Sequence, residues 1–472
     1  MEKEKKIGKL STLTKVGYGV GTAGDSIPYT LFFTYFIFYL TDIAGVSAAV
    51  AGVVSFLAIV WQGITGPVIG YMSDNSTNPK GRRRPLLIKV ILPYSIILVL
   101  LFTPVPFEGG AKAAYYLIMA MLLWTGYSAY KGPWDALGAE LTQDYNERNV
   151  IRLFVGICAY PACLVAQSGT MGVVGAFSSK GEIENGWFYA AILCAAVTLI
   201  ACFISWKATA GKEPLQENQG AEHKSGVADL FRQYFALLKV RAYRILVIFQ
   251  FVFLIGYTIM MNLTVYMLSY NAGLSESQQS VFWLANTVTC IIALPLVTFI
   301  ANKIDKKACI YIFSVLYVVA SVVFFFVGIT GFISALIFAF GVALATSAFF
   351  GIFYSLIYDC CEVYELVTGE RREGGIMALA QFAQTMGSAV AGLIVGGLLT
   401  MVGYTGTGVE SAETIHGILG ITTLIPAAIV FVSLLLLTRY KMTQEKFEKV
   451  KAAIEEKKAG KQVDLTQFKD LI

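Results

Sequence analysis

A single lysine lies within a long apolar segment, in the sequence Tyr127–Asp135 (YSAYKGPWD). If the segment is a helix, the helical period places five side chains on one side: Tyr127, Ser128, Lys131, Trp134 and Asp135. An ammonium group at this position either extends along its aliphatic stem to cytoplasmic water or points into a polar cavity. In a cavity it would pair with Asp25 or Asp135, or it would bind an anionic group of a ligand.

Asp25 follows the glycine-rich stretch 17–24, at the start of another apolar run. Because a charge that faces lipid is costly, we expect this carboxylate to face a cavity or a partner. The alternative is an aspartate that caps a helix near the membrane interface.

Long apolar runs alternate with short charged loops along the whole chain. Six runs begin near residues 27, 48, 86, 113, 151 and 187, and six more begin near residues 245, 280, 308, 332, 376 and 417. Each supplies roughly 20 apolar residues, which is the length that a helix needs to cross ~30 Å of hydrocarbon. Helices close their own backbone hydrogen bonds, so the sequence predicts an all-α integral membrane protein with twelve transmembrane helices.

Almost every Lys and Arg falls in alternate loops, and the opposite loops contain only Lys112 and Lys180. By the positive-inside rule, both termini and the long polar stretch in the middle of the chain are cytoplasmic. This stretch defines four parts: an N-terminal six-helix half at 1–206, a cytoplasmic linker at 207–240, a C-terminal six-helix half at 241–440 and a cytoplasmic tail at 441–472.

Within the linker, we predict a mobile segment at 208–225 and a surface helix at 227–239. In the tail, alternating Lys and Glu at 441–458 predict a solvated amphipathic helix.

The composition excludes several classes of protein. The chain is 56% hydrophobic and only 14% charged, outside the range of soluble domains. Its net charge of +5 is spread along one membrane face, which does not indicate a nucleic-acid partner. The eight cysteines lack zinc-type spacing and are expected to be small buried side chains rather than metal ligands. No H-E-x-x-H, G-x-S-x-G or phosphate-loop motif indicates an enzyme.

Two short motifs surround the loop between the second and third runs, namely Gly70–Asp74 (GYMSD) and Gly81–Pro85 (GRRRP). Gly70 would permit close approach of helices, and Asp74 would accept hydrogen bonds from basic side chains or a helix end. This arrangement resembles the loop signature of major-facilitator transporters. Further matching segments are Tyr39–Ser47, Pro133–Leu137 with Glu147-Arg148, and an acidic block that begins at Asp359.

Together these segments make the chain similar to the glycoside–pentoside–hexuronide:cation symporters, the family of melibiose permease. The resemblance extends from about Gly17 to the tail. It implies a major facilitator fold with two six-helix halves and a substrate site near mid-membrane. It also implies a monomeric secondary transporter of the bacterial cytoplasmic membrane, which moves a sugar, glycoside or sugar acid by alternating access. The alternative is a transporter of a non-sugar organic anion or lipid-like solute without sodium coupling.

The resemblance also implies which residues contact the small-molecule substrate. Relatives use an Asp near position 25 for sugar hydroxyls, and they carry a sugar-binding Asp where this chain has Lys131. Trp134 and Phe350 either provide an apolar platform for a sugar ring or pack between helices. The expected substrate-binding set is Asp25, Ser128, Lys131, Trp134, Asp135, Phe350 and Thr385.

The chain departs from the family pattern at the positions that bind sodium. In the segment Trp61–Pro67, Gln62 and Gly66 replace two carboxylates, which leaves Gln62 and Thr65 as neutral oxygen ligands. Thr385 likewise stands where relatives often carry Lys. We therefore expect no cofactor and, if transport is coupled, protons rather than sodium, with these candidate titrating groups: Asp25, Lys131, Asp135 and Glu140.

The resemblance further implies a cytoplasmic gate of ion pairs that link the halves. Its expected members are Arg148, Asp359, Glu362, Glu365 and Arg371, and Lys303 is a further candidate cation. The alternative is a solvated set of charges at a helix end.

Overall fold

The computed structural model describes residues 10–74, 76, 78, 81–142, 144–212, 236–370, 372–406, 408–459 and 465–472. Every regular element in these ranges is a helix. Ten helical segments are long and apolar enough to cross a membrane. The helical stretch Ala23–Ile43 and helix α5 (Gly109–Glu140) complete the twelve spans that the sequence predicts. The expected all-α membrane fold is confirmed.

Packing divides the chain into two compact units. One comprises Met1–Lys224 with Leu274–Thr287 and Gly406–Gly408, and the other comprises Ser225–Gly273, Val288–Thr405 and Val409–Ile472. The predicted mobile segment at 208–225 lies largely outside the described residues, and so does most of the predicted surface helix at 227–239.

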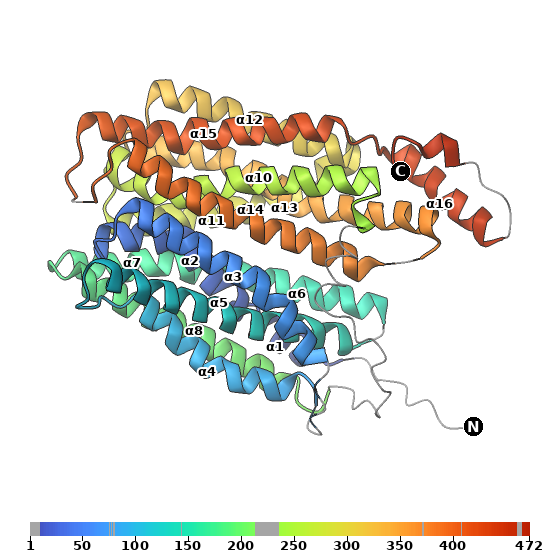
Figure 1. Ribbon diagram of the computed structural model, residues 1–472, viewed down its shortest axis with the longest axis horizontal. Helices are drawn as coiled ribbons and strands as arrows, with labels where there is room; N and C mark the ends of the chain where they lie inside the picture. The colour runs from blue at the N-terminus through green and yellow to red at the C-terminus, as the bar shows by residue number, and fades with distance from the viewer. Residues whose placement is uncertain are drawn as a thin grey trace. The chain divides into compact units, whose positions relative to one another are not determined.

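Helices of the first unit run side by side (Figure 1). Their bounds are α1 (Thr12–Val20), α2 (Ala23–Phe38), η1 (Tyr39–Ile43), α3 (Ala48–Asp74), α4 (Arg84–Leu101), α5, α6 (Tyr145–Leu164), η2 (Val165–Gly169), α7 (Thr170–Ser178) and α8 (Ile183–Ala208). The first apolar run starts earlier than expected, because α1 and α2 follow one another with a break at Gly21 and Thr22.

The second unit contains the remaining helices. They are α10 (Arg241–Tyr266), η3 (Met267–Asn271), α11 (Glu276–Lys303), α12 (Lys306–Val327), α13 (Phe332–Thr368), α14 (Glu373–Met401), α15 (Ala412–Thr438), α16 (Gln444–Lys458) and η4 (Leu465–Phe468). The N-terminal part of α11 packs within the first unit, where the Ser280 hydroxyl donates to the Ser168 carbonyl oxygen at 2.7 Å.

Large apolar side chains lie on the outside of the helices, including Ile292, Phe299 and Val319. Small and aromatic residues fill the interior, as in α2, where Phe32, Tyr35 and Phe36 are buried. This distribution suits a solvent of lipid tails, because helix association in lipid depends on close packing rather than on burial of apolar surface.

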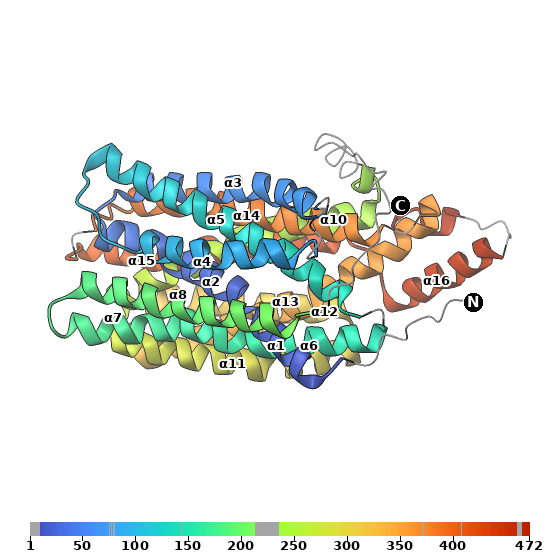
Figure 2. The ribbon, with the colours of Figure 1, turned by 90° about the horizontal axis from the view of Figure 1, so that it is seen from below.

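The tail is not a freely solvated helix, which corrects the expectation from its charge pattern. Helix α16 packs against the end of α13 (Figure 2) and buries Val450, Ala453 and Ile454. Lys458 forms an ion pair with Glu365 at 2.7 Å. The sequence pattern identified the helix, but its apolar stripe has a partner only in the folded unit.

Candidate functional site

The polar centre of the first unit is an ammonium group between two carboxylates. Lys131 Nζ on α5 lies 2.9 Å from Asp25 Oδ2 on α2 and 3.2 Å from Asp135 Oδ2 on α5. The Tyr127 hydroxyl donates to Asp25 Oδ1 at 2.6 Å. Both pairings that the sequence left open for Lys131 are therefore present, and the lysine points to partners inside the protein.

These charged side chains remain partly exposed. The exposed fractions of the side chains are 31% for Lys131, 22% for Asp25 and 54% for Asp135. Asp25 lies in the first turn of α2, but its contacts run to α5, and no side chain caps this helix by a hydrogen bond. The capping alternative is thus not the one adopted.

Tyrosine hydroxyls fix the start of α2 against its neighbours. Tyr94 of α4 donates to the Gly24 carbonyl oxygen at 3.0 Å, and Tyr130 of α5 donates to the Gly21 carbonyl oxygen at 2.8 Å. A Cβ at Gly24 would overlap the Tyr130 ring and the Cys202 sulfur. The glycines therefore allow α2 to approach α5 and α8 closely, which brings Asp25 within reach of Lys131.

Trp134 lies deeper than a binding platform would. Its side chain is 1% exposed, stacks on Tyr18 at 4.7 Å between ring centroids, and donates from Nε1 to Ser205 Oγ at 3.1 Å. Lys131 Nζ lies 5.6 Å from the centroid of its ring. The packing alternative left open for this residue accounts for these contacts.

A second cation influences the site from α6. Arg152 interacts electrostatically with Asp135. The site therefore contains two carboxylates and two cations. Lys131 lies between the carboxylates, and Arg152 interacts with Asp135. The sequence alone does not connect Arg152 with Asp135, because the two residues are 17 positions apart on different helices.

Gln62 and Thr65 lie on α3, which packs against α5. The Thr65 hydroxyl donates to the Trp61 carbonyl oxygen at 3.0 Å, so its hydrogen atom is used within its own helix. A Cβ at Gly66 would come within 4.0 Å of Ser128 Oγ on α5. The side of α3 from which relatives present a carboxylate therefore faces Ser128.

Phe350 and Thr385 belong to the second unit. Phe350 on α13 packs edge-on against Tyr257, with ring centroids 5.4 Å apart. The Thr385 hydroxyl on α14 donates to the Gln381 carbonyl oxygen at 3.1 Å. The neighbouring Gln384 accepts a hydrogen bond from Tyr354 at 2.7 Å. The second unit therefore presents aromatic and amide groups near these positions, and the side chain at Thr385 is uncharged.

Three of the residues expected in a cytoplasmic gate, Arg148, Asp359 and Glu365, have partners within their own units. Lys306 Nζ lies 2.9 Å from Asp359 Oδ2, and Glu365 pairs with Lys458 on α16. Arg148 Nε donates to the Thr142 carbonyl oxygen at 2.9 Å in the first unit. Glu362 lies on α13 between the two acidic partners, and Arg371 lies outside the described residues.

The loop motif after α3 forms a charge cluster with α5. Arg83 Nη2 lies 2.9 Å from both Asp74 Oδ1 and Glu140 Oε1, and Arg82 also pairs with Glu140 at 3.1 Å. Burial lowers the pKa of Arg83, but the hydrogen bonds and charges of Glu140 and Asp74 outweigh it and leave that pKa raised. Glu140 is thus held by two guanidinium groups. The expected role of Gly70 in close packing is wrong, since a Cβ there would meet no atom of the described chain within 4 Å.

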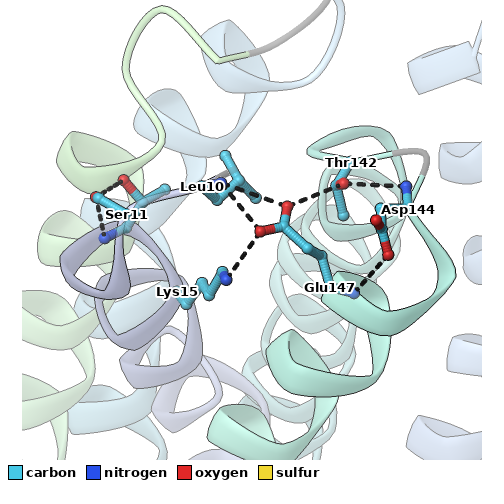
Figure 3. Close-up of polar contacts among 7 residues, drawn as sticks. Leu10, Ser11, Lys15, Thr142, Asp144 and Glu147 are labelled. Atoms are coloured by element: carbon cyan, nitrogen blue, oxygen red, sulfur yellow. Dashed lines mark hydrogen bonds and ion pairs between the residues drawn. The ribbon is translucent and has the colours of Figure 1, made fainter. Parts of the chain in front are cut away.

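Glu147, which belongs to one of the family motifs in the sequence, forms a further cluster (Figure 3). Its carboxylate accepts from the Leu10 N–H at 3.2 Å, from Lys15 Nζ at 3.0 Å and from the Thr142 hydroxyl at 3.2 Å. The Glu147 N–H donates to Asp144 Oδ1 at 3.1 Å. This buried carboxylate ties the beginning of α1 to the beginning of α6.

Twelve membrane helices in two units, with a charged polar centre inside one of them, define a secondary transporter of the major facilitator class rather than an enzyme. Residues 17–444 match the model of the family described as MFS/sugar transport protein. The chain belongs to that family. The family resemblance that the sequence motifs carry is confirmed.

Several relatives are similar over nearly their whole length. The uncharacterized symporter YnaJ of Bacillus subtilis (strain 168) is 26% identical over 459 residues, with 95% of each chain covered. A glucuronide carrier protein homolog of Escherichia coli (strain K12) is 25% identical, covering 96% of this chain and 98% of the relative. A putative sulfoquinovose importer of Salmonella typhimurium (strain LT2) is 24% identical, covering 98% and 97%.

The fold is also similar to that of a solved transporter. The crystal structure of the nucleoside transporter NupG superposes with a TM-score of 0.63 at 14% identity, covering 91% of this chain and 99% of that chain. At this identity the likeness concerns the fold alone.

Proposed function

We propose that this protein transports an acidic sugar derivative, with a carboxylate or a sulfonate group, together with protons. The observation that carries the proposal is the position of Lys131, whose side chain is partly exposed and whose ammonium group lies between Asp25 and Asp135. Charge-assisted hydrogen bonds from such a group bind oxyanions strongly. Relatives named for a glucuronide and for sulfoquinovose, both acidic sugars, support this class of substrate.

The proposal favours protons over sodium as the coupling ion. Sodium needs several oxygen ligands and a compensating negative charge, whereas α3 offers Gln62, Thr65 and Gly66. Asp25 and Asp135 are carboxylates that can bind a proton within the charged site.

The finer arrangement in the membrane is part of the same proposal. Alternating loop charge supports cytoplasmic termini, a cytoplasmic linker at 207–240 and a cytoplasmic tail at 441–472. We propose that the protein functions as a monomer in the cytoplasmic membrane, with the halves 1–206 and 241–440 and the substrate set Asp25, Ser128, Lys131, Asp135, Phe350 and Thr385.

Counterflow in proteoliposomes tests the substrate class. The purified protein should exchange labelled methyl glucuronide or sulfoquinovose, but not methyl glucoside at the same concentration. In Lys131→Gln, the affinity for the acid should fall about 10- to 100-fold, because a hydrogen bond to a charged group contributes about 1.5–3 kcal/mol. Lys131→Arg, which keeps the positive charge, should retain more of the affinity than Lys131→Gln.

The controls separate chemistry from folding and from coupling. Thermal unfolding in detergent should show that both lysine variants are folded. In proteoliposomes, an imposed proton gradient should then drive accumulation of the acidic sugar, and an imposed sodium gradient should not. If the protein exchanges methyl glucoside and Lys131→Gln leaves this exchange unchanged, the proposed substrate class is contradicted. If a sodium gradient drives accumulation, the proposed coupling ion is contradicted.

A further inference from the structure

We propose that Asp25 is the carboxylate that takes up the coupling proton when an anionic substrate binds to Lys131. The inference rests on the proposed function, since it requires an acidic substrate at Lys131. It goes further by assigning the proton to one residue and by fixing the charge that crosses the membrane.

Lys131 already has as many carboxylate partners as it can neutralise, or more. Its ammonium group already contacts Asp25 Oδ2 at 2.9 Å and Asp135 Oδ2 at 3.2 Å. A substrate anion at the same nitrogen would place three negative groups around one lysine. Within a membrane protein such an excess of charge is expensive, and the site relieves it when one carboxylate binds a proton.

The surroundings of the two carboxylates decide which of them is protonated. Asp135 is 54% exposed and interacts with Arg152, so it keeps both water and a second cation when Lys131 turns to the substrate. Asp25 is only 22% exposed, and Lys131 is its one ion-pair partner in the described part of the chain.

Besides Lys131, the described groups that interact with Asp25 are neutral side chains and one like charge, Asp135. Tyr127 of α5 donates to its Oδ1 at 2.6 Å, and Tyr94 of α4 and Cys163 of α6 interact with its charge. Cys202 of α8 lies against the adjacent Gly24, and Asp135 adds a like charge. Once the contact with Lys131 is lost, the hydrogen bond from Tyr127 still favours the anion, whereas burial and the negative charge of Asp135 favour the neutral carboxylic acid.

The proton balance is simple. The substrate anion binds to the Lys131 ammonium, the Asp25 carboxylate leaves that ammonium, and one proton from water forms the O–H bond of the Asp25 carboxyl group. Release of the substrate on the other side restores the contact between Asp25 and Lys131 and releases the proton there. A monoanionic substrate and one proton together carry no net charge, so transport is electroneutral.

Proton uptake on binding is the direct test. In weakly buffered detergent solution with a pH indicator, the wild-type protein should take up about one proton for each methyl glucuronide that it binds. In the pH range where this uptake occurs, its affinity for methyl glucuronide should fall about tenfold for each unit by which the pH rises. In Asp25→Asn, whose amide retains a similar shape, binding should take up no proton and its affinity should not depend on pH. Asp135→Asn tests the competing carboxylate. Whatever its affinity, it should still take up about one proton for each methyl glucuronide that it binds, and loss of this uptake would assign the proton to Asp135 instead.

The outcomes separate this inference from the proposed function. If methyl glucuronide and sulfoquinovose do not bind, the proposed function fails and the inference fails with it. If the acid binds without proton uptake, or if Asp25→Asn takes up a proton as the wild type does, only the inference is overturned. Should Asp25→Asn fail to fold, Asp25→Glu provides the second variant. The Asp25→Glu protein must still take up a proton on binding methyl glucuronide, and the pH dependence of its affinity must differ from that of the wild type. An unchanged pH dependence would overturn the assignment.

Discussion

Gly138 leaves room for the Tyr18 side chain, which stacks on Trp134. A Cβ at Gly138 would overlap the hydroxyl group of Tyr18, the ring that stacks on Trp134. We expect Gly138→Ala to displace Tyr18 and to destabilise the protein by about 1–3 kcal/mol, as overpacking of a filled interior does. The measurement is thermal unfolding of the purified protein in detergent.

Gly132 provides the control on the same helix. A Cβ there would meet no described atom within 4 Å, so Gly132→Ala should leave stability unchanged or raise it by up to about 1 kcal/mol through helix propensity. Equal destabilisation by the two substitutions would show that the contact with Tyr18 is not the cause.

At the residue scale, the sequence could identify partners along one helix but not the depth of each side chain. Spacing within α5 predicted that Lys131 and Asp135 share a side, and an apolar environment predicted a partner for Asp25. The same spacing could not tell that Trp134 turns toward Tyr18 and Ser205, because these residues come from α1 and from the end of α8. Long-range contacts of this kind leave no local periodicity.

The junction of α1 and α6 depends on the buried carboxylate of Glu147. Glu147→Gln removes the negative charge that faces Lys15 and the N–H of Leu10 (Figure 3). We expect a loss of about 1.5–3 kcal/mol in the free energy of unfolding, the range for hydrogen bonds to a charged group. Faster hydrogen exchange confined to α1 and the start of α6 would locate the effect.

A surface carboxylate gives the comparison for this element. Glu445 pairs with Lys449 on the exposed face of α16, so Glu445→Gln should leave both unfolding and exchange in α1 unaltered. A wild-type exchange pattern in Glu147→Gln would contradict the role assigned to the cluster.

Element boundaries were predictable to the extent that they follow hydropathy. The twelve runs became twelve spans, yet the sequence did not predict the separate helix α1 or the docking of α16. Helix α1 is only 9 residues long and precedes the apolar run, whereas the stripe Val450, Ala453 and Ile454 is hidden among Lys and Glu residues. Such segments depend on tertiary contacts more than on their own propensity.

At the scale of the whole molecule, the paired halves follow from apolar length and loop charge, and the family follows from motifs scattered over the chain. The charged gate is a different kind of expectation, because it concerns contacts that change during transport. Arg148 contacts Thr142 in one unit, while Asp359 and Glu365 pair with Lys306 and Lys458 in the other. These contacts give Asp359 and Glu365 cationic partners within their own unit.

We propose that Arg148, with Arg371 and the acidic residues Asp359, Glu362 and Glu365, forms ion pairs between the halves in the state closed to the cytoplasm. Arg148→Ala should then slow transport in proteoliposomes while the affinity for methyl glucuronide in detergent stays unaltered. Because an exposed ion pair contributes about 1 kcal/mol or less, the rate should fall by about fivefold at most. Lys449→Ala, which removes an exposed cation on α16, is the control and should transport at the wild-type rate. An Arg148→Ala protein that transports as fast as wild type, or one that loses affinity in proportion to rate, would exclude the gate.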